Sequence, residues 1–494
     1  MDSAVFELFF RSAPFEGKFA VFAGVEEIMS FFKYFKFTES HISYLKTILP
    51  NKKSDEAFYN WLKTLGPHML KVSCQKEGSI VFPKEPLLNI EGPLGLIKLL
   101  EAPMISLTSF PTLVATNAAR MRSVVPLSKQ LYEYGLRRAQ GSGAALVASR
   151  YAYLGGFQET SNLLASNRYN IPLSSTHSHA FVTAFRNLDE IDEFELNGIQ
   201  IKERTNYYRK ILEFNKTSES ELAAFLAHAK AFPKNFICLV DSFDSITSGI
   251  PNFIIVAFAL MDAGYSPFGV RIDSGDLVKI SLTARSLIDN AGRQVNKNTS
   301  NIKIMVSNKI GEKELKEFSE EDHEIDIFAI ETELVVCEDQ PHLGMVFKLV
   351  DINGKAAMKF SEDPGKSTLP GKKTLYRVWV ASQTEPIADI VALPDEDIMN
   401  NKEIDVVSIQ QTQSRYTIIP QKIERIYYQV IDQGQLISKV NDLEESKLHL
   451  EEQKKLFGPN LMDDEKQYML VLTVNYWNYF QEAAQKSLIP KIIH

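Results

Sequence analysis

The sequence predicts an α/β fold, with a parallel sheet in the middle of the chain and α+β regions on either side. Apolar, strand-like segments begin near residues 236, 267, 302 and 325, and a helical pattern follows each of the first three. These segments are continuously apolar, as is typical of parallel strands that are buried on both faces. No G-x-G-x-x-G pattern follows any of them, which argues against a dinucleotide-binding fold.

Length and composition indicate a globular protein with more than one domain. The chain has 494 residues, of which 45% are apolar and 23% charged, so disorder, collagen and coiled coil are excluded as the main state. The longest apolar run, Phe253–Met261, has nine residues, whereas a membrane span needs about 18. The N-terminus lacks the pattern of a secretory signal. We therefore expect no membrane partner.

Charge and cysteine content narrow the class further. The formal net charge is −8 and the pI is near 5.7, so the basic surplus of a general nucleic-acid binder is absent. The three cysteines, Cys74, Cys238 and Cys337, are far apart and odd in number. This pattern encodes neither a disulfide framework nor a zinc knuckle, and a cytoplasmic location is the simplest expectation.

The first region, residues 1–105, reads as an α+β domain. Short apolar runs are separated by the turn-rich stretch SAPFEG, and residues 25–35 carry apolar side chains at helical spacing. Residues 78–92 alternate short apolar runs with Pro and Gly, which favours strands and turns.

The middle region, residues 106–340, contains the predicted sheet, and either a barrel or an open doubly wound sheet fits its pattern. Polar residues follow the strands: Asp241 after the first, Arg271 to Ser274 at the second and Asn308 after the third. In parallel α/β folds, the carboxyl ends of the strands carry the site. For Ser274, capping of the next helix is an equally good explanation. Arg271 lies inside an apolar run and must have partners if it is buried.

The last region, residues 341–494, changes pattern again and is expected to form an α+β region that packs on the N-terminal domain. A hairpin is predicted at Asn353-Gly354, and residues 440–456 predict a charged, solvent-facing helix. Residues 383–415 read as polar and irregular. The segment YMLVLTVNYWNYFQ reads as core.

Three segments carry residues suited to chemistry. Arg137 and Arg138 precede a Gly-rich turn, where guanidinium groups suit phosphate or carboxylate, although a surface pair is the alternative. His177 and His179 allow either a metal site or a single histidine that acts as nucleophile or proton carrier. Arg271 and Asp273 point the same way on an extended segment, an arrangement suited to a phosphorylated sugar.

Taken together, the segments resemble the nicotinate phosphoribosyltransferase family. The resemblance runs in order from about residue 4 to 373. It rests on FELFFRSAPFEGKFAVFAG, GSIVFPKEPLLNIEGPL, YGLRRAQG, YLGGFQETSNLLA, THSHAFVTAF, FGVRIDSGDL and VFKLVDINGKAAMKFSEDPGKSTLPGKK.

The resemblance implies a fold and a reaction. The fold is that of the type II phosphoribosyltransferases: an incomplete α/β barrel joined to an α+β domain, here with a C-terminal extension, working as a homodimer. The reaction joins nicotinate to phosphoribosyl pyrophosphate, giving nicotinate mononucleotide and pyrophosphate. It is coupled to ATP hydrolysis, uses Mg²⁺ and serves the salvage of nicotinate into NAD.

The resemblance also implies roles for residues that handle phosphate and the pyridine ring. His179 aligns with the histidine that ATP phosphorylates, while His177 is secondary. Asp241 is the expected acid that orients His179. Tyr134 aligns with an aromatic residue that stacks on the pyridine ring. Arg137 is expected to bind an anion.

Further contacts are implied at the sugar and at the nicotinate carboxylate. Arg271 is a second anion-binding arginine, and Asp273 is expected to hold ribose hydroxyls or magnesium. Ser161 stands where nicotinamide-using relatives carry an Asp, so its hydroxyl favours nicotinate. The remaining expected substrate contacts are Thr176, Ser274 and Asn308.

The sequence departs from the family pattern around the expected 5′-phosphate. Ala329 and Glu331 replace two glycines, and Lys309 replaces an Asp near the ribose. A carboxylate about 4 Å from phosphate repels it by roughly 4 kcal/mol at an effective dielectric constant near 20. Lys309 is one potential partner for Glu331. An alternative function is therefore a catalytically impaired member that acts as a binding or dimer-partner subunit.

The N-terminus is a further departure. Relatives begin with a segment whose tyrosine closes over the pyridine ring, and this chain starts after that point. Either the sequence is truncated or the contact is absent.

Overall fold

The computed structural model describes residues 2–49, 56–359, 368–409, 414–458 and 468–487. The chain divides into two compact units. One consists of Met1–Thr116 with Asp339–His494, and the other is Asn117–Glu338. Part of the loop SEDPGKSTLPGKK, residues 361–367, lies outside the described residues.

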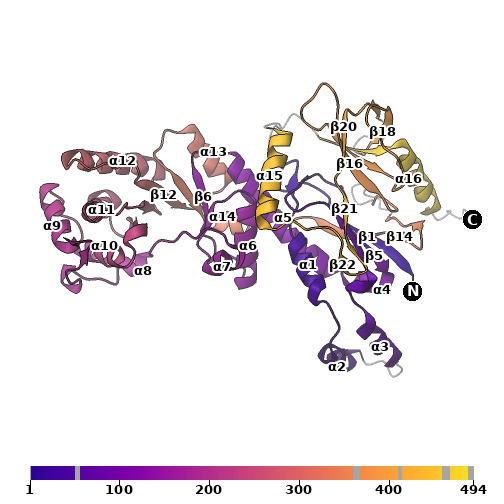
Figure 1. The fold of residues 1–494 in the computed structure, drawn as a ribbon, viewed down its shortest axis with the longest axis horizontal. Coiled ribbons are helices and arrows are strands. Elements are labelled where there is room, and N and C mark those ends of the chain that lie inside the picture. Colours follow the sequence, from indigo (N-terminus) through magenta and orange to yellow (C-terminus); the bar gives the residue numbers. More distant parts are fainter. Residues whose placement is uncertain (1, 50–55, 360–367, 410–413, 459–467, 488–494) are drawn as a thin grey trace, which may run out of the picture. The chain divides into compact units, whose positions relative to one another are not determined.

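The first unit contains two large sheets (Figure 1), of which the first combines strands from both ends of the chain and the second is formed within residues 374–473. The first sheet has the order β15 (Lys355–Ala356), β14 (Met345–Ile352), β1 (Ser3–Phe10), β5 (Leu88–Pro93), β3 (Lys71–Cys74), β21 (Tyr428–Asp432) and β22 (Gln435–Leu436). The second has the order β19 (Arg415–Ile418), β18 (Ile404–Ser408), β23 (Met469–Thr473), β17 (Ala388–Ala392), β16 (Thr374–Trp379) and β20 (Lys422–Arg425). A short pair joins β2 (Ala20–Val21) to β4 (Ile80–Val81).

The helices of this unit include the predicted charged helix, α15. They are α1 (Val25–Tyr34), α2 (Glu39–Ile48), α3 (Glu56–Thr64), η1 (Pro67–Met69), α4 (Leu94–Leu99), α15 (Leu443–Phe457) and α16 (Val474–Ser487), with α5 (Glu101–Ser123) running across the boundary between the units. In α15, Leu443, Leu450 and Phe457 are buried, so one face is packed while the charged side chains take the other.

The hairpin at Asn353-Gly354 is confirmed. Strands β14 and β15 pair antiparallel, and Asn353 and Gly354 have φ values of 52° and 74°. Both values lie in the left-handed region that a two-residue hairpin turn of this kind requires. The segment YMLVLTVNYWNYFQ forms β23 and the start of α16, and the prediction that it is core is confirmed by the buried Leu470, Val471 and Tyr476.

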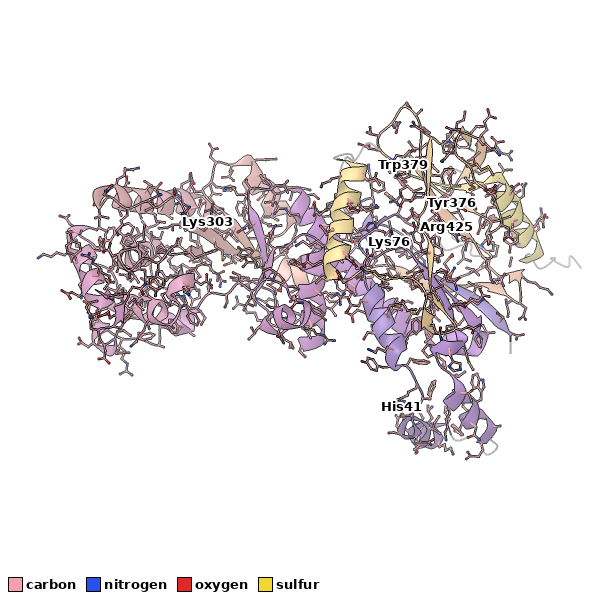
Figure 2. All side chains as sticks on the ribbon, in the orientation of Figure 1. His41, Lys76, Lys303, Tyr376, Trp379 and Arg425 are labelled. Carbon is pink, nitrogen blue, oxygen red and sulfur yellow. The ribbon has the colours of Figure 1, made fainter. Side chains whose placement is uncertain are left out.

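The reading of residues 383–415 as irregular was wrong. This stretch contributes β17 and β18, and every residue of β17 is buried. Asp389 breaks the apolar pattern of β17 because it forms a buried ion pair with Arg377 of β16, at 2.8 Å. Figure 2 shows Tyr376 of β16 and Arg425 of β20, which lie opposite each other in the register of the same sheet.

The second unit is built on an entirely parallel sheet, as predicted. Its order is β10 (Ile237–Leu239), β11 (Gly269–Ile272), β12 (Lys303–Asn308), β13 (Ile327–Ile330), β6 (Gln130–Glu133) and β7 (Glu159–Thr160). A separate short hairpin joins β8 (Glu195–Leu196) to β9 (Ile199–Gln200). The four strands predicted near residues 236, 267, 302 and 325 are therefore neighbours in sequence order.

Helices connect the strands of this unit. They are α6 (Ser142–Leu154), α7 (Leu163–Tyr169), α8 (His179–Val182), η2 (Leu188–Glu190), α9 (Ile201–Ile211), α10 (Glu219–Ala231), η3 (Pro233–Asn235), the π-helical segment η4 (Ser245–Gly249), α11 (Ile250–Asp262), α12 (Leu277–Gln294), α13 (Glu312–Glu320) and α14 (Thr332–Val335). Among the described residues, Ser245–Asp262 is long and apolar enough to cross a membrane by length and composition. Because 72% of that window is buried inside the protein, it has the character of a core helix.

Candidate functional site

The parallel sheet of the second unit gathers the predicted site residues along one edge. Because parallel strands end on the same side of a sheet, the residues that follow them are brought together. Tyr134 follows β6, Asp241 follows β10 and Asp273 follows β11. Asn308 ends β12, and Glu331 directly follows β13.

Arg271 lies at the centre of this edge, 8% exposed, on the buried strand β11. Its Nε donates to Ser307 Oγ at 2.8 Å, and Nη1 donates to Thr176 Oγ1 at 3.0 Å. Its Nη2 donates to Asp273 Oδ1 at 3.3 Å and to Glu331 Oε1 at 3.4 Å. The expectation that a buried Arg271 must have partners is confirmed.

Tyr134 lies beside this arginine. The guanidinium carbon of Arg271 is 5.3 Å from the centroid of the Tyr134 ring, a cation–π distance. The Tyr134 hydroxyl is 3.0 Å from Ser174 Oγ, and burial raises its pKa, so it stays protonated. The ring is 7% exposed. Arg271 therefore fixes the orientation of the aromatic ring that is expected to meet the pyridine.

His179 begins α8 and reaches toward two carboxylates. Ser178 caps the helix, and His179 Nδ1 lies 3.0 Å from Ser242 Oγ. His179 Nε2 is 4.0 Å from Asp241 Oδ1 and 3.9 Å from Asp273 Oδ2. The side chain is 47% exposed, so an external phosphate can reach it. The two carboxylates lie close enough to orient the imidazole ring.

One carboxylate oxygen of Asp241 accepts no hydrogen bond from the described residues and is available to a cation. Its Oδ2 accepts a hydrogen bond from Ser274 Oγ at 2.6 Å, whereas Oδ1 is buried and accepts none within the described part of the chain. Within the same ranges, no group of three or more His, Cys, Asp or Glu side chains forms a metal-binding cluster. Any divalent cation here would depend on Asp241 and Asp273 together with ligands supplied by a substrate.

His177 has a structural position. Its Nε2 accepts a hydrogen bond from the Leu239 N–H at 3.3 Å, and its ring packs against Phe181, Phe225 and His228. Burial lowers the pKa of His177 to about 3. A neutral, enclosed imidazole cannot carry protons for an external substrate at neutral pH, which agrees with its secondary rank in the sequence.

Arg137, expected to bind a substrate anion, is engaged by Glu331. The Nη2 atom of Arg137 lies 3.0 and 2.9 Å from the two carboxylate oxygens. Arg138 Nε adds a contact of 3.3 Å to Oε2. The partners of Glu331 are therefore arginines in place of Lys309. Gly135 allows this approach, because a Cβ at that position would lie 2.9 Å from the Glu331 carbonyl oxygen and closer still to Val335.

Ser161 and Asn308 stand next to this network. The Ser161 N–H donates to the Glu133 carbonyl at 2.8 Å, which places the serine beside the end of β6. Asn308 is exposed and has a φ of 124°, in a region that a non-glycine residue rarely adopts. Strained backbone of this kind clusters at ligand-binding sites.

Some contacts of the site were not predicted, although Arg138 was named beside Arg137 as a partner for phosphate or carboxylate. Ser242 contacts His179, Ser307 contacts Arg271 and Arg138 contacts Glu331. Glu133, 1% exposed, accepts hydrogen bonds from Ser149, Thr160 and the Gly135 N–H and so fixes the loop after β6. The position of Ser242 and Ser307 at strand ends was an available signal, whereas nothing local in the sequence marks Glu133.

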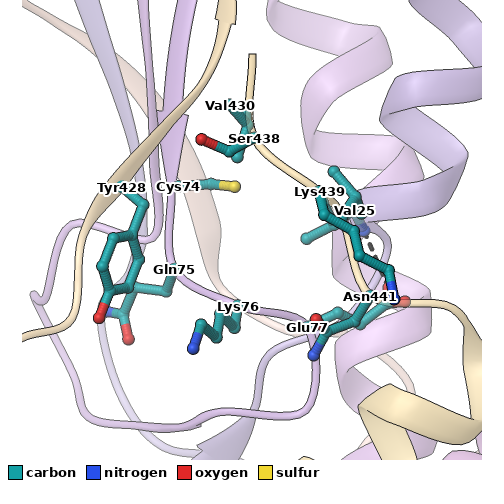
Figure 3. A pocket seen from close by; sticks show the side chains of 11 residues that line it. Val25, Cys74, Gln75, Lys76, Glu77, Tyr428, Val430, Ser438, Lys439 and Asn441 are labelled. Atoms are coloured by element: carbon teal, nitrogen blue, oxygen red, sulfur yellow. Dashed lines mark hydrogen bonds between the residues drawn. The ribbon is translucent and has the colours of Figure 1, made fainter. Parts of the chain in front are cut away.

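A separate cavity of about 160 Å³ lies in the first unit. Its lining includes Cys74, Lys76 and Tyr428 (Figure 3) and none of the predicted site residues. Burial raises the pKa of the Cys74 thiol to about 12, so the reactive thiolate is not populated at neutral pH. This cavity does not offer thiol chemistry.

Two family models match the chain. One is described as the nicotinate phosphoribosyltransferase (NAPRTase) N-terminal domain and matches residues 1–109. The other is described as the nicotinate phosphoribosyltransferase C-terminal domain and matches residues 372–480.

Relatives and solved structures agree with these matches. The nicotinate phosphoribosyltransferase of Dictyostelium discoideum is 40% identical over 460 residues, 90% of this chain and 77% of that protein. The structure of human nicotinic acid phosphoribosyltransferase matches with a TM-score of 0.88 at 32% identity, covering 97% of this chain and 95% of that one. It confirms the predicted incomplete-barrel class. A nicotinate-nucleotide pyrophosphorylase from Pyrococcus furiosus, at 18% identity and a TM-score of 0.60 (92% of this chain, 90% of that one), shares the fold.

The buried His177 predicts a pH dependence of stability. Its folded pKa of about 3 is below the ordinary 6.5, so the unfolded chain binds a proton that the folded chain does not. This difference leaves the free energy of unfolding unchanged above about pH 6.5. It lowers the free energy of unfolding by about 1.4 kcal/mol per pH unit as the pH falls from 6.5 toward 3. The His177→Gln variant keeps an acceptor at the position of Nε2 for the Leu239 N–H but should lose less stability on acidification. Urea unfolding of both proteins at several pH values measures this. Parallel pH dependences would contradict it.

Proposed function

The chain belongs to the nicotinate phosphoribosyltransferase family, and from this premise we propose that it joins nicotinate to phosphoribosyl pyrophosphate, forming nicotinate mononucleotide and pyrophosphate. The observation that carries this proposal is the position of Arg271, Asp273 and His179 on one edge of the parallel sheet. The coupling to ATP and the homodimer remain proposals that rest on the family resemblance, and the cytoplasmic location is a proposal that rests on the cysteine pattern.

In the transfer step, the pyridine nitrogen of nicotinate attacks C1 of the ribose and the bond from C1 to pyrophosphate breaks. The electron pair of the broken bond leaves with pyrophosphate, and the new bond from nitrogen to C1 makes the ring a pyridinium cation. Arg271 supplies a fixed positive charge, and Tyr134, which it orients, offers an aromatic surface for the ring. Ser161 is proposed to donate to the nicotinate carboxylate.

The proposed role of ATP depends on His179. A neutral imidazole nitrogen attacks the γ-phosphorus, the bond to ADP breaks and a phosphohistidine forms. The two ring nitrogens have different partners, since Nδ1 lies near Ser242 while Nε2 faces Asp241 and Asp273. Later attack of water releases inorganic phosphate and restores the ring.

The residues present fit a magnesium ion that arrives with the phosphates. The donor set is two carboxylates, and Mg²⁺ in phosphate-handling sites is typically held by one or two carboxylates plus substrate oxygens. Asp273, with Asp241, would hold it. Bound there, the ion would neutralise phosphate charge. Thr176, Ser274 and Asn308 are proposed to contact the substrate around it.

The alternative of a non-catalytic subunit receives no support from the comparisons, because the relatives carry the name of the enzyme. The main reason for this alternative was the expectation that the Glu331 carboxylate would repel the 5′-phosphate. In the structure, that carboxylate is held by arginines and 7% exposed.

A turnover assay tests the function directly. Purified protein with nicotinate, phosphoribosyl pyrophosphate, ATP and magnesium should form nicotinate mononucleotide, measured by chromatography. Omission of either nicotinate or phosphoribosyl pyrophosphate should abolish the product. If the folded protein forms no product under these conditions, the proposed function is refuted.

The His179→Ala variant tests the coupling. It should abolish the ATP hydrolysis that depends on nicotinate and leave a slower transferase reaction that ATP does not accelerate. Release of phosphate and formation of nicotinate mononucleotide are followed in parallel. His342→Ala, which removes an exposed histidine of the other unit, is the matched control. Coupled ATP hydrolysis that persists in His179→Ala would refute the phosphohistidine.

Ser161 tests the recognition of the carboxylate. Ser161→Asp should raise the KM for nicotinate by about tenfold or more, because a second carboxylate repels the substrate. Ser161→Ala loses only a hydrogen bond and should cost about tenfold or less. Steady-state kinetics with varied nicotinate compares the two. Equal KM values for Ser161→Asp and the unmodified protein would place Ser161 away from the carboxylate.

A further inference from the structure

The carboxylate of Glu331 lies among three guanidinium groups. Arg137 contacts both of its oxygens, Arg138 contacts Oε2 and Arg271 contacts Oε1, at distances of 2.9 to 3.4 Å. The Glu331 side chain is 7% exposed, whereas those of Arg137 and Arg138 are 64% and 49% exposed. An internal anion therefore occupies the inner side of an arginine cluster whose outer side is open to solvent.

The charges of this cluster are nearly balanced without any ligand. The three arginines face the carboxylates of Glu331 and Asp273, which leaves a formal charge of +1. Loss of the Glu331 charge alone would raise it to +2. The second value is the better complement for a phosphate dianion, because carboxylate and phosphate use the same guanidinium donors.

We propose that Glu331 lowers the affinity for the phosphoribosyl substrate. Its carboxylate, which is tethered in the site, competes with the phosphate groups of that substrate for Arg137 and Arg138. This inference rests on the proposed function. A phosphate that engages the exposed side of Arg137 must share it with Glu331 or displace it. The carboxylate also repels the incoming anion at short range. Glu331 therefore lowers the affinity for the phosphorylated substrate and leaves nicotinate recognition unaffected.

The opposite role is a purely structural one, in which Glu331 only holds the arginines in place. Loss of its charge would then let Arg137 and Arg138 spread into solvent and would weaken the binding of phosphate. The two roles give opposite signs for one measurement. The sign of the change in affinity therefore decides between them.

The test compares Glu331→Gln with the unmodified full-length protein by isothermal titration with phosphoribosyl pyrophosphate and magnesium. The variant should bind about tenfold more tightly, and its affinity should fall more steeply with salt, because one more positive charge is uncompensated. Glu320→Gln, which removes the same charge from an exposed position on α13, should change nothing. Unchanged or weaker binding by Glu331→Gln would overturn the proposal.

Kinetics add a readout that a structural role would not produce. In Glu331→Gln, the KM for phosphoribosyl pyrophosphate should fall while the KM for nicotinate stays constant. If Glu331→Gln does not fold, as judged by circular dichroism, Glu331→Asp serves as the second variant. Its shorter side chain holds Arg137 less well, so its affinity should also rise, by a smaller factor. A fall would overturn the proposal.

Inorganic pyrophosphate separates the failure of this inference from failure of the proposed function. Its binding needs no turnover, so titration of both proteins with pyrophosphate reports on the arginine cluster alone. Tighter binding by Glu331→Gln, in a protein that makes no nicotinate mononucleotide, would support competition by Glu331 and refute the proposed enzymatic activity. Product formation without tighter binding would do the reverse.

Discussion

The buried guanidinium group of Arg271 is the constraint around which the site is arranged. A charge in the interior is costly unless it is paired and hydrogen-bonded, so every donor of this group needs an acceptor within reach. Thr176, Ser307, Asp273 and Glu331 come from four separate stretches of the chain and meet at this one group. Because Asp273 also faces His179, it connects the arginine to the histidine.

The sequence predicted those parts of the site that depend on local order along the chain. The strand segments and the polar residues after them were visible as pattern, and parallel pairing of β10 to β13 in sequence order brings Asp241 and Asp273 together. The contact of Glu331 with Arg137 could not be read this way. It arises because β6, from much earlier in the chain, pairs with β13 and lays the two following loops side by side.

The same limit explains the error at residues 383–415. Polar residues inside a strand read as irregular when their partners are distant in the sequence. Asp389 is fully buried because Arg377 of the neighbouring strand lies against it, and only the register of β16 and β17 reveals that pair. The argument from charge at Glu331 was incomplete for a related reason. It offered Lys309 as a partner for the carboxylate, whereas the fold surrounds the carboxylate with the guanidinium groups of Arg137, Arg138 and Arg271.

The edge strands of the parallel sheet are shorter than its interior strands. The outermost strands, β10 and β7, have three and two residues, while the interior strands have four to six. The margins of a sheet that does not close into a barrel can recruit strands of other chains through unpaired backbone groups. Here the margins are partly satisfied within the chain, because Thr160 of β7 forms backbone hydrogen bonds with residues 172 and 174 and the Leu239 N–H of β10 donates to His177. Short margins offer too few such groups in a row for stable pairing. The open architecture therefore carries its own protection against self-association through the sheet, without the charged or proline-rich margins that long strands require.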